Sequence, residues 1–154
     1  MPISIKKLFL RTLGRLIPSD FFSHHFPVSI KGVCFMENKV ILLKNERRNW
    51  DLPGGKLKRK EEVVACLERE MLEELNITVQ VKDLLDVTQI SVMNTVSVFV
   101  VIYGCTTQAS PGELKISQES FEVGLFTIDE LDGLRIRQAY REVIRRAFRT
   151  VDLK

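Results

Sequence analysis

The feature of this sequence that most restricts its fold is a Pro-Gly-Gly turn placed directly before a long amphipathic segment. Pro53, Gly54 and Gly55 interrupt any helix or strand, and the glycines allow a sharp loop in which the backbone closely approaches another group. Residues 62–75 then carry apolar residues three to four positions apart, which predicts a helix. Its apolar stripe is Val64, Leu67, Met71 and Leu75. We therefore expect a loop that leads into a helix N-terminus, where free backbone N–H groups attract anions.

Five other segments carry the apolar patterns that predict β-strands: residues 28–36, 40–44, 77–87, 92–105 and 121–127. A short polar turn joins the first two into a hairpin, and the fourth is expected to be long and largely buried. Polar residues at 45–49 and 106–118 predict loops, and the chain closes with a helical turn at 129–132 and a helix over 135–149. Because strands and helices intermix, we expect an α/β (α+β) fold, in which a mixed β-sheet lies between helices on both faces.

An amphipathic segment with basic residues precedes these elements. Residues 3–17 show helical spacing, and Pro18 ends the pattern. We expect an N-terminal extension over residues 1–20 and a single domain over residues 21–154. The extension either docks on its own domain or on a second subunit, which would give a homodimer, or lies on an anionic membrane. Docking is the favoured interpretation, and we expect no membrane partner.

Composition restricts the class of partner. The 154 residues carry a net charge of +3, with Lys and Arg scattered, so we expect a small anionic ligand rather than a nucleic acid duplex. No apolar run approaches the ~20 residues of a membrane span, and the basic start lacks the apolar stretch of a signal peptide. Cys34 and Cys105 lie in apolar runs, and the three cysteines lack zinc-site spacing. Buried, reduced thiols and a cytoplasmic location are therefore expected.

The helix after the Pro-Gly-Gly loop carries the residues that indicate chemistry. Glu70, Glu73 and Glu74 share one face, opposite the apolar stripe, and Glu61 lies just before the helix. Carboxylates gathered in one patch repel one another, and a hard divalent cation would relieve that repulsion. By spacing alone, a solvated acidic helix face is an equally good interpretation. Arg69 is expected to pair with Glu73 or to brace the loop.

The stretch from Trp50 to Ile77, WDLPGGKLKRKEEVVACLEREMLEELNI, resembles the Nudix box. The box pattern is G-x5-E-x7-R-E-U-x-E-E-x-G-U, in which U is an aliphatic residue. Eight of the nine fixed positions match in register: Gly55, Glu61, Arg69, Glu70, Met71, Glu73, Glu74 and Ile77. The departure is Asn76, which replaces Gly at the helix end, and Asn is the best substitute in a left-handed conformation. Lys60 also stands where Gly is frequent, and we expect it to change only the stiffness of the loop.

The resemblance extends over residues 26–150 and implies a Nudix-type α/β/α sandwich, with Mg²⁺ or Mn²⁺ as cofactor. It places the metal ligands at the carboxylates of the box and at one backbone carbonyl: Gly55, Glu61, Glu70, Glu73 and Glu74. It gives Arg69 and Gly54 a structural role that braces the loop.

The resemblance also implies catalytic carboxylates. They are Glu70 and Glu74 in the box and Glu119 in the loop before the last strand. Glu70 and Glu119 are alternative general bases, and Glu113 and Glu122 are weaker candidates. For Glu119, an ordinary loop carboxylate is an equally good interpretation.

Residues that bind the substrate are less evident. Arg47 and Arg48 precede the box and could hold a phosphate or stack on a base, although a solvated loop is the better interpretation. Trp50 either contacts a base or anchors the loop in the core. Further candidates for a base pocket are Phe22, His24, His25 and Phe26, although the two histidines are better interpreted as surface residues.

The resemblance implies a Mg²⁺-dependent pyrophosphohydrolase that cleaves a nucleoside diphosphate linked to another moiety. ADP-ribose or another nucleotide sugar is slightly preferred to a nucleoside triphosphate. The alternative is a Nudix-fold module that binds a nucleotide for regulation without catalysis. Such modules usually lose box carboxylates, and all four are present here. A domain with a chance match to the box is the weakest interpretation.

Overall fold

The computed structural model describes residues 26–92, 96–115 and 122–151. The elements in chain order are β1 (Val28–Met36), β2 (Lys39–Lys44), β3 (Trp50–Asp51), α2 (Val63–Leu75), β4 (Gln80–Val92), β5 (Val96–Thr106), η2 (Pro111–Glu113), β6 (Glu122–Phe126), η3 (Glu130–Gly133) and α3 (Gln138–Val151). The predicted extension, residues 1–20, lies outside the described residues.

A mixed β-sheet forms the middle of the molecule. Its strands follow the order β3-β2-β1-β5-β4, and β6 pairs with β2 off this path. β1 and β5 are parallel, whereas the β1–β2, β2–β6 and β4–β5 pairs are antiparallel. A parallel pair needs a long crossover, and helix α2 lies within it. The prediction of a mixed sheet is confirmed.

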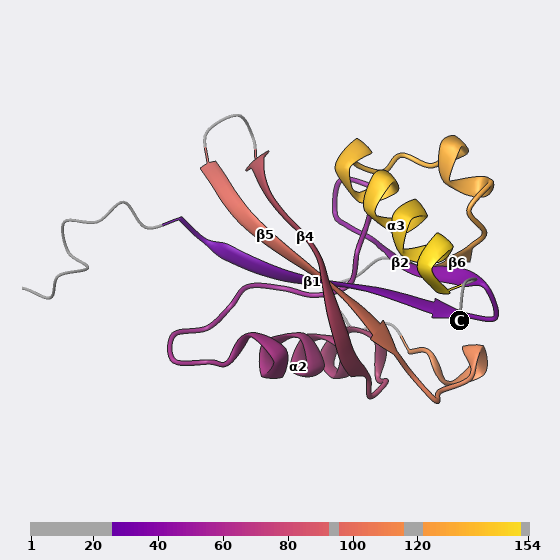
Figure 1. Cartoon of the computed structure of the whole chain (residues 1–154), viewed down its shortest axis with the longest axis horizontal. Coiled ribbons are helices and arrows are strands. Elements are labelled where there is room, and N and C mark those ends of the chain that lie inside the picture. Colours follow the sequence, from indigo (N-terminus) through magenta and orange to yellow (C-terminus); the bar gives the residue numbers. More distant parts are fainter. Residues whose placement is uncertain (1–25, 93–95, 116–121, 152–154) are drawn as a thin grey trace, which may run out of the picture.

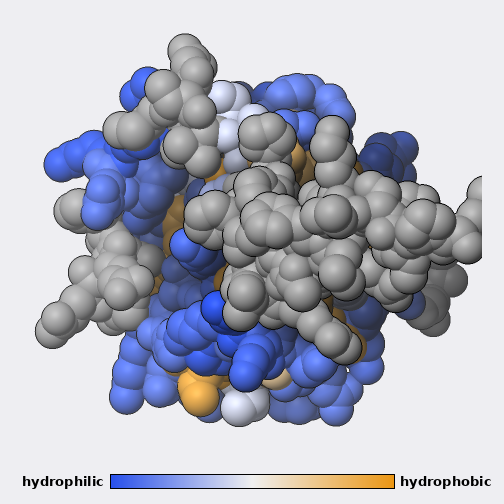
Figure 2. All heavy atoms as spheres, turned by 90° about the vertical axis from the view of Figure 1, so that its left-hand side faces the viewer, coloured by the Kyte–Doolittle hydropathy of each residue, from blue (hydrophilic) through white to orange (hydrophobic). Residues whose placement is uncertain are grey.

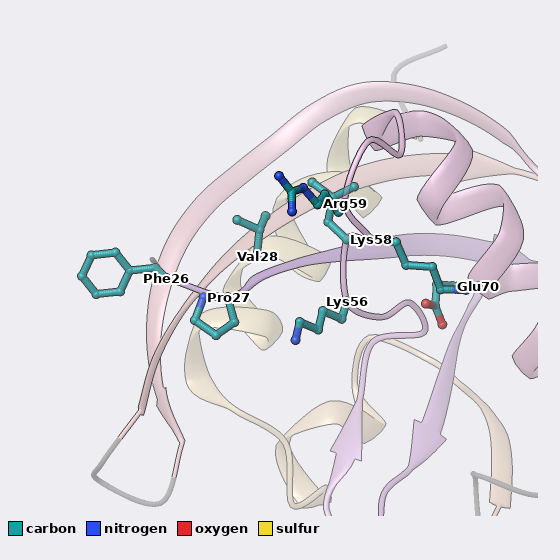
Figure 3. Close-up of a pocket in the computed structure, with 8 residues that line it drawn as sticks. Phe26, Pro27, Val28, Lys56, Lys58, Arg59 and Glu70 are labelled. Carbon is teal, nitrogen blue, oxygen red and sulfur yellow. The ribbon is translucent and has the colours of Figure 1, made fainter. Parts of the chain in front are cut away.

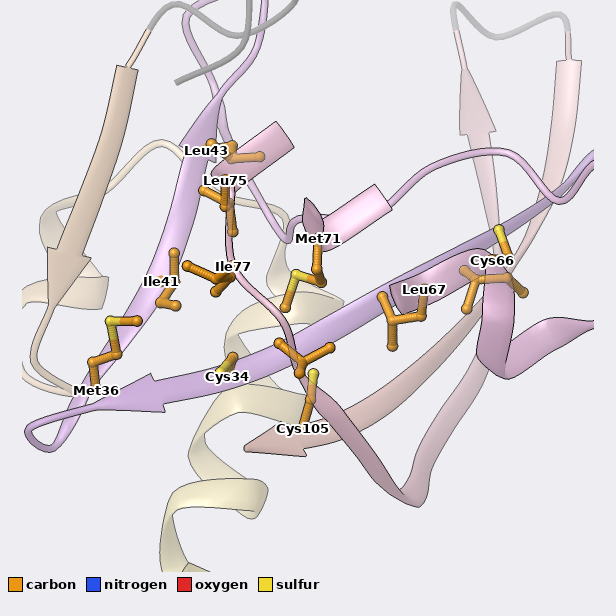
Figure 4. Packing of buried hydrophobic residues seen from close by; sticks show 12 residues of the cluster. Cys34, Met36, Ile41, Leu43, Cys66, Leu67, Met71, Leu75, Ile77 and Cys105 are labelled. Carbon is orange, nitrogen blue, oxygen red and sulfur yellow. The ribbon is translucent and has the colours of Figure 1, made fainter. Parts of the chain in front are cut away.

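The two α-helices lie on opposite faces of this sheet, α2 below it and α3 above it in Figure 1. Side chains alternate along β1, so that Ile30 and Cys34 join the core cluster under α2, whereas Val33 joins the cluster under α3. Figure 4 shows the first cluster, in which Leu67 and Met71 of α2 pack against the sheet. The predicted α/β/α sandwich is therefore confirmed.

A two-residue turn joins β1 to β2. Met36 pairs with Lys39, which leaves Glu37 and Asn38 as the turn. Their φ angles are 48° and 64°, as in the type I′ turns that match the twist of a hairpin. The predicted hairpin is confirmed, and β2 starts one residue earlier than predicted.

The helix predicted after the loop is confirmed as α2, but one residue of its predicted apolar stripe is not buried. Leu67, Met71 and Leu75 are fully buried, but Val64 is 44% exposed. Val63, which is half-buried, packs against the core instead. The buried face therefore runs through Val63, Leu67, Met71 and Leu75, with Cys66 beside them, and Val64 lies outside it.

Two departures from the box pattern have a positive φ. Asn76 ends α2 with φ 58° and ψ 33°, and its N–H donates to the carbonyl of Leu72, which is the left-handed end expected of this residue. Lys60 has φ 64°. A side chain costs about 1–2 kcal/mol in this conformation, so Lys60 strains the backbone rather than only changing the stiffness of the loop.

The predicted bounds of β4 and β5 were wrong. β4 spans Gln80–Val92 instead of 77–87, since Ile77 and Val79 are buried in the core under α2 before pairing with β5 begins. β5 starts at Val96 and is not buried throughout, because side chains alternate along it. Val100 is fully buried, and Phe99 is 36% exposed.

Helix α3 starts at Gln138 rather than at the predicted residue 135. The amide of Trp50 donates to the carbonyl of Arg135 at 2.8 Å, and Trp50 forms a parallel bridge with Ile136. These contacts hold the preceding residues extended beside β3, so the helix begins only after them.

Two further observations concern the cysteines and the helices. Cys34, Cys66 and Cys105 are buried and free, which confirms the prediction for the two cysteines in apolar runs. No helix among the described residues is long and apolar enough to cross a membrane.

Candidate functional site

The Pro-Gly-Gly loop is fastened along strand β1. The amide of Ile30 donates to the carbonyl of Gly55 at 2.8 Å, and the amide of Gly32 donates to that of Pro53 at 2.9 Å. Gly54 has φ 119°, and a Cβ there would lie 2.2 Å from the carbonyl oxygen of Ile30. Only glycine permits this approach, so the geometry agrees with a loop-bracing role for Gly54.

Lys31 also ties the loop to β1, and it was not among the predicted site residues. Its Nζ donates to the carbonyl oxygens of Leu52 at 2.8 Å and Gly54 at 2.7 Å, and it lies 3.7 Å from Oδ1 of Asp51. The signal that was available is a lysine in the middle of an otherwise apolar strand. A half-buried charge of this kind needs partners.

Two carboxylates of α2 face this loop. The amide of Gly54 donates to Oε2 of Glu74 at 2.8 Å. A Cβ on Gly55 would lie 2.4 Å from the carboxyl carbon of Glu70, so the missing side chain leaves room for that carboxylate. Burial raises the pKa of Glu74, and the nearby charge of Glu70 raises it further, against the opposing effects of the Gly54 amide and Lys31.

Arg69 joins the other carboxylates of the box. Its Nε donates to Glu61 Oε1 at 2.7 Å, and its Nη1 donates to Glu70 Oε1 at 2.7 Å and to Glu73 Oε2 at 2.9 Å. The expected pairing with Glu73 is therefore present, within a larger network. The hydrogen bond from Arg69 is the main reason that the pKa of Glu61 falls to about 2, and the same network raises the pKa of Arg69.

The carboxylates of the box are divided between an arginine and the loop. Glu61, Glu70 and Glu73 surround a guanidinium, whose charge relieves the repulsion that we assigned to a metal, and Glu74 turns to the loop. Within the part of the chain that the structure describes, no three acidic, His or Cys side chains form a ready metal site.

The donor set nevertheless fits a hard divalent cation. Glu70 and Glu74 offer carboxylate oxygens beside the Gly54–Gly55 turn, and carboxylate oxygens are the ligands that Mg²⁺ prefers. The carboxylate of Glu74 is largely buried, with a raised pKa, so a cation beside it would stabilise its charge. The carbonyl of Gly55 already accepts from Ile30 and, at 3.3 Å, from Oγ of Ser29.

A groove of about 690 Å³ runs from the start of β1 to Glu70. Lys56, Lys58 and Arg59 line it, with Phe26 at one end and Glu70 at the other (Figure 3). Hydrophilic residues dominate the coloured surface on this side of the molecule, with apolar patches between them (Figure 2). The groove therefore combines cationic side chains with an acidic end.

Arg47 and Trp50 line a second, smaller pocket of about 320 Å³. Trp50 is only 8% exposed, and its ring packs edge-on against Phe126 at 4.6 Å, so it anchors the loop in the core. Arg48 is exposed, has φ 57°, and does not line either groove or pocket.

The candidate general bases outside the box are Glu119, Glu113 and Glu122, and the structure describes the last two. Glu119 lies outside the described residues, as do Phe22, His24 and His25. Glu122 pairs with Lys44 at 2.6 Å, and Glu113 caps η2 by accepting from Ser110. Both glutamates already have structural partners.

Comparison with known proteins agrees with this geometry. The sequence profile of the NUDIX domain matches residues 25–147. The 8-oxo-dGTP diphosphatase of Buchnera aphidicola subsp. Acyrthosiphon pisum (strain APS) is 47% identical over 36 residues, which are 23% of this chain and 29% of that protein. The matched segment thus spans less than a third of that relative.

Two solved structures show the same fold. A MutT protein from Methanosarcina mazei Go1 aligns with a TM-score of 0.70 and 22% identity, over 86% of this chain and 100% of that one. An ADP-ribose pyrophosphatase from Streptococcus suis 89-1591 aligns with a TM-score of 0.67 and 18% identity, over 82% of this chain and 92% of that one. At these identities the likeness concerns the fold alone.

Proposed function

We propose that this chain, which belongs to the Nudix family, is a Mg²⁺-dependent pyrophosphohydrolase acting on a nucleoside diphosphate linked to another moiety. The observation that carries the proposal is the contact between the Pro-Gly-Gly loop and α2. Glu74 accepts from the amide of Gly54 at 2.8 Å, and the carboxyl of Glu70 occupies the space beside Gly55.

Charge along the groove supports a phosphate-bearing substrate. Lys56, Lys58 and Arg59 line the groove that ends at Glu70. Cationic side chains attract the phosphate oxygens and stabilise charge that develops on the leaving group. A substrate in this groove would place its phosphates beside the box carboxylates.

We assign the metal ligands to Glu70, Glu73 and Glu74, with Glu61 as an auxiliary ligand and the carbonyl of Gly55 as a further one. A bound Mg²⁺ or Mn²⁺ supplies positive charge that neutralises phosphate oxygens and lowers the pKa of a bound water.

Arg69 is the positioning residue. It holds Glu61 and Glu70 at 2.7 Å and Glu73 at 2.9 Å, which fixes these carboxylates relative to the loop. The three side chains are therefore orientated before any ligand binds.

The proton of the attacking water goes to a carboxylate in this proposal. Glu70 is the candidate within the box, because its carboxyl lies beside Gly55 at the acidic end of the groove. Glu119 is the alternative base, and Glu74 completes the proposed catalytic set.

For the substrate, we propose ADP-ribose or another nucleotide sugar ahead of a nucleoside triphosphate. The groove continues past its cations to Phe26, whose ring packs edge-on against Phe99 at 5.3 Å. This apolar end offers a surface for a second moiety beyond the phosphates. The relatives include both an ADP-ribose pyrophosphatase and an 8-oxo-dGTP diphosphatase, so both classes are kept.

We further propose that Arg47 lies on the substrate side of the site, whereas Trp50 anchors the loop in the core and Arg48 lines neither the groove nor the pocket. A cytoplasmic location is also part of the proposal, because the three cysteines are free thiols, which persist in reducing compartments.

The test is hydrolysis by the purified chain of ADP-ribose, other nucleotide sugars and (deoxy)nucleoside triphosphates with Mg²⁺, with the products separated by chromatography. Glu74→Gln should abolish turnover, whereas Glu68→Gln, an exposed position on the same helix, should preserve it. AMP released from ADP-ribose and pyrophosphate released from a triphosphate are distinct products. Binding of nucleotide without turnover of any compound would instead support the regulatory module.

A further inference from the structure

The small pocket beside β3 is built from two distant segments of the chain. Residues of the 45–51 segment form one side and residues 135–137 form the other. The amide of Trp50 donates to the carbonyl of Arg135 at 2.8 Å, which joins the two sides. The side chain of Asn45 accepts from the amides of Arg47 at 3.0 Å and Asn49 at 3.1 Å. The loop is thereby held in one shape.

Three arginines line this pocket: Arg47, Arg135 and Arg137. Within the described ranges, none of them forms an ion pair. By contrast, Arg69 and Arg145 pair with acids at 2.7 Å and 2.8 Å. Such a concave cluster leaves positive charge without an internal partner.

The pocket contains one acid, Asp51, which offsets only part of this charge. Its Oδ1 lies 3.7 Å from Nζ of Lys31, which is itself directed to the loop carbonyls. Asn45 and Asn49 add polar amide groups to the lining. The net charge of the pocket therefore favours an anionic ligand.

The lining suits an oxyanion better than a stacked base. Trp50 is the aromatic residue of the pocket, but Lys44 Nζ lies 4.7 Å above its ring and Phe126 packs against it edge-on. Guanidinium forks match the oxygens of phosphate, each with two parallel N–H donors. Arginines and amides around a small hollow thus indicate a phosphate-type anion.

The pocket lies close to the box carboxylates. Asp51 lines it, and Gly54, which donates to Glu74, follows three residues later. Three residues span at most about 11 Å of chain. One nucleotide could therefore reach from the box carboxylates into this pocket with a second anionic group.

We propose that the pocket lined by Arg47, Arg135 and Arg137 is a second anion site, which binds a phosphate group separate from the anhydride that is cleaved. That phosphate is either an additional phosphate of the substrate or a free phosphate ion. The first source rests on the proposed hydrolase function, and the second does not.

Binding is measured without Mg²⁺ and without turnover. Trp50 is the single tryptophan of the chain and lines the pocket, so its fluorescence reports occupancy, and calorimetry provides a second readout. The probes are inorganic phosphate, adenosine 5′-monophosphate and adenosine 3′,5′-bisphosphate. The two nucleotides share the same base and sugar, so the ratio of their affinities reports the contribution of the second phosphate. The variants are Arg135→Gln/Arg137→Gln and Arg47→Gln, with Arg48→Gln as a control that lies in the same loop and does not line the pocket.

If the substrate supplies the phosphate, the bisphosphate binds at least tenfold tighter than the monophosphate. This ratio falls towards one in the double variant and persists in Arg48→Gln. If the ligand is free phosphate, inorganic phosphate binds without any nucleotide, and the monophosphate and the bisphosphate have the same affinity. Arg47→Gln and the double variant each then lower the affinity for inorganic phosphate at least tenfold.

The proposal is overturned if none of the probes gives a heat or a fluorescence change, or if the affinities are the same in the wild type and the pocket variants. Hydrolysis of the substrate panel is scored separately. Failure of hydrolysis with intact, arginine-dependent anion binding would remove the hydrolase proposal and leave the anion site.

Discussion

The two adjacent glycines of the loop should respond in opposite ways to the same substitution to alanine. At Gly54, a Cβ would lie 2.2 Å from the backbone oxygen of Ile30, and φ is 119°. At Gly55, a Cβ would lie 2.4 Å from the carboxyl carbon of Glu70, the far end of a flexible side chain. The first substitution should destabilise the fold, and the second should displace a carboxylate.

The magnitudes follow from these contacts. Gly54→Ala combines a conformational cost of about 1–2 kcal/mol with an overpacking cost of about 1–3 kcal/mol, because the loop must move off β1. At about 2–4 °C per kcal/mol for a domain of this size, its melting temperature should fall by roughly 4–20 °C. Gly55→Ala should lower stability less, by about 1 kcal/mol, because it disturbs one part-buried hydrogen bond, from Arg69 to Glu70.

The functional effect of Gly55→Ala should nevertheless be large. Ordinary contact requires 3.4 Å or more, so the carboxylate of Glu70 must move by about 1 Å, a displacement that can cost on the order of 100-fold in rate. We expect kcat/KM to fall by about that factor while the melting temperature changes little.

The assay pairs thermal unfolding, followed by circular dichroism, with steady-state kinetics on the substrate found in the panel. Gly133→Ala is the matched control, because a Cβ there meets nothing within 4 Å, and it should change neither quantity. Full activity in Gly55→Ala, or an unchanged melting temperature in Gly54→Ala, would refute the reasoning.

Three further predictions concern single side chains. Burial raises the pKa of Glu74 above its ordinary value of 4.5, so the folded state binds that proton more tightly, and metal-free protein should lose stability as pH rises above 4.5. Glu74→Gln should remove this loss of stability. The free energy of unfolding, measured by urea denaturation in EDTA at pH 4 and pH 8, checks this prediction, and the same pH dependence in the variant and the wild type would contradict it. Lys60→Gly should raise the free energy of unfolding by about 0.5–1 kcal/mol, because glycine adopts a positive φ without strain. Urea denaturation measures this change, and a loss of stability would show that the added chain entropy of glycine outweighs the relieved strain. Burial, aided by Glu61, raises the pKa of Cys66 to about 11, so iodoacetamide at pH 8 should modify it only after denaturation, and mass spectrometry of the native protein would expose the opposite outcome.

Features that depend on local sequence were predictable. Glu37 and Asn38 sit where a polar pair interrupts apolar alternation, and they form the tight turn of the hairpin. Asn76 ends α2 in the left-handed conformation because few other residues tolerate it. Such features involve residues a few positions apart, so the order of residues is sufficient to specify them.

Errors arose where a distant segment competes with local preference. The apolar pattern of 135–149 continues the helix back to Arg135, but hydrogen bonding to Trp50 keeps that residue extended. Val64 has the right spacing for the buried stripe, yet Val63 packs against the core in its place. Helical spacing identifies a face, whereas the packing partner decides which edge of that face is covered.

The sequence by itself determined the Pro-Gly-Gly loop, the acidic helix after it, and the resemblance that implies their chemistry, because all of these lie within one continuous stretch. Only the tertiary structure decided how that stretch is used. It placed Lys31 on the loop carbonyls and brought Arg47 and Arg137 to the lining of one pocket. These side chains meet because the chain folds back on itself through the sheet, and charges that lie far apart in sequence interact only when packing brings them within a few ångströms.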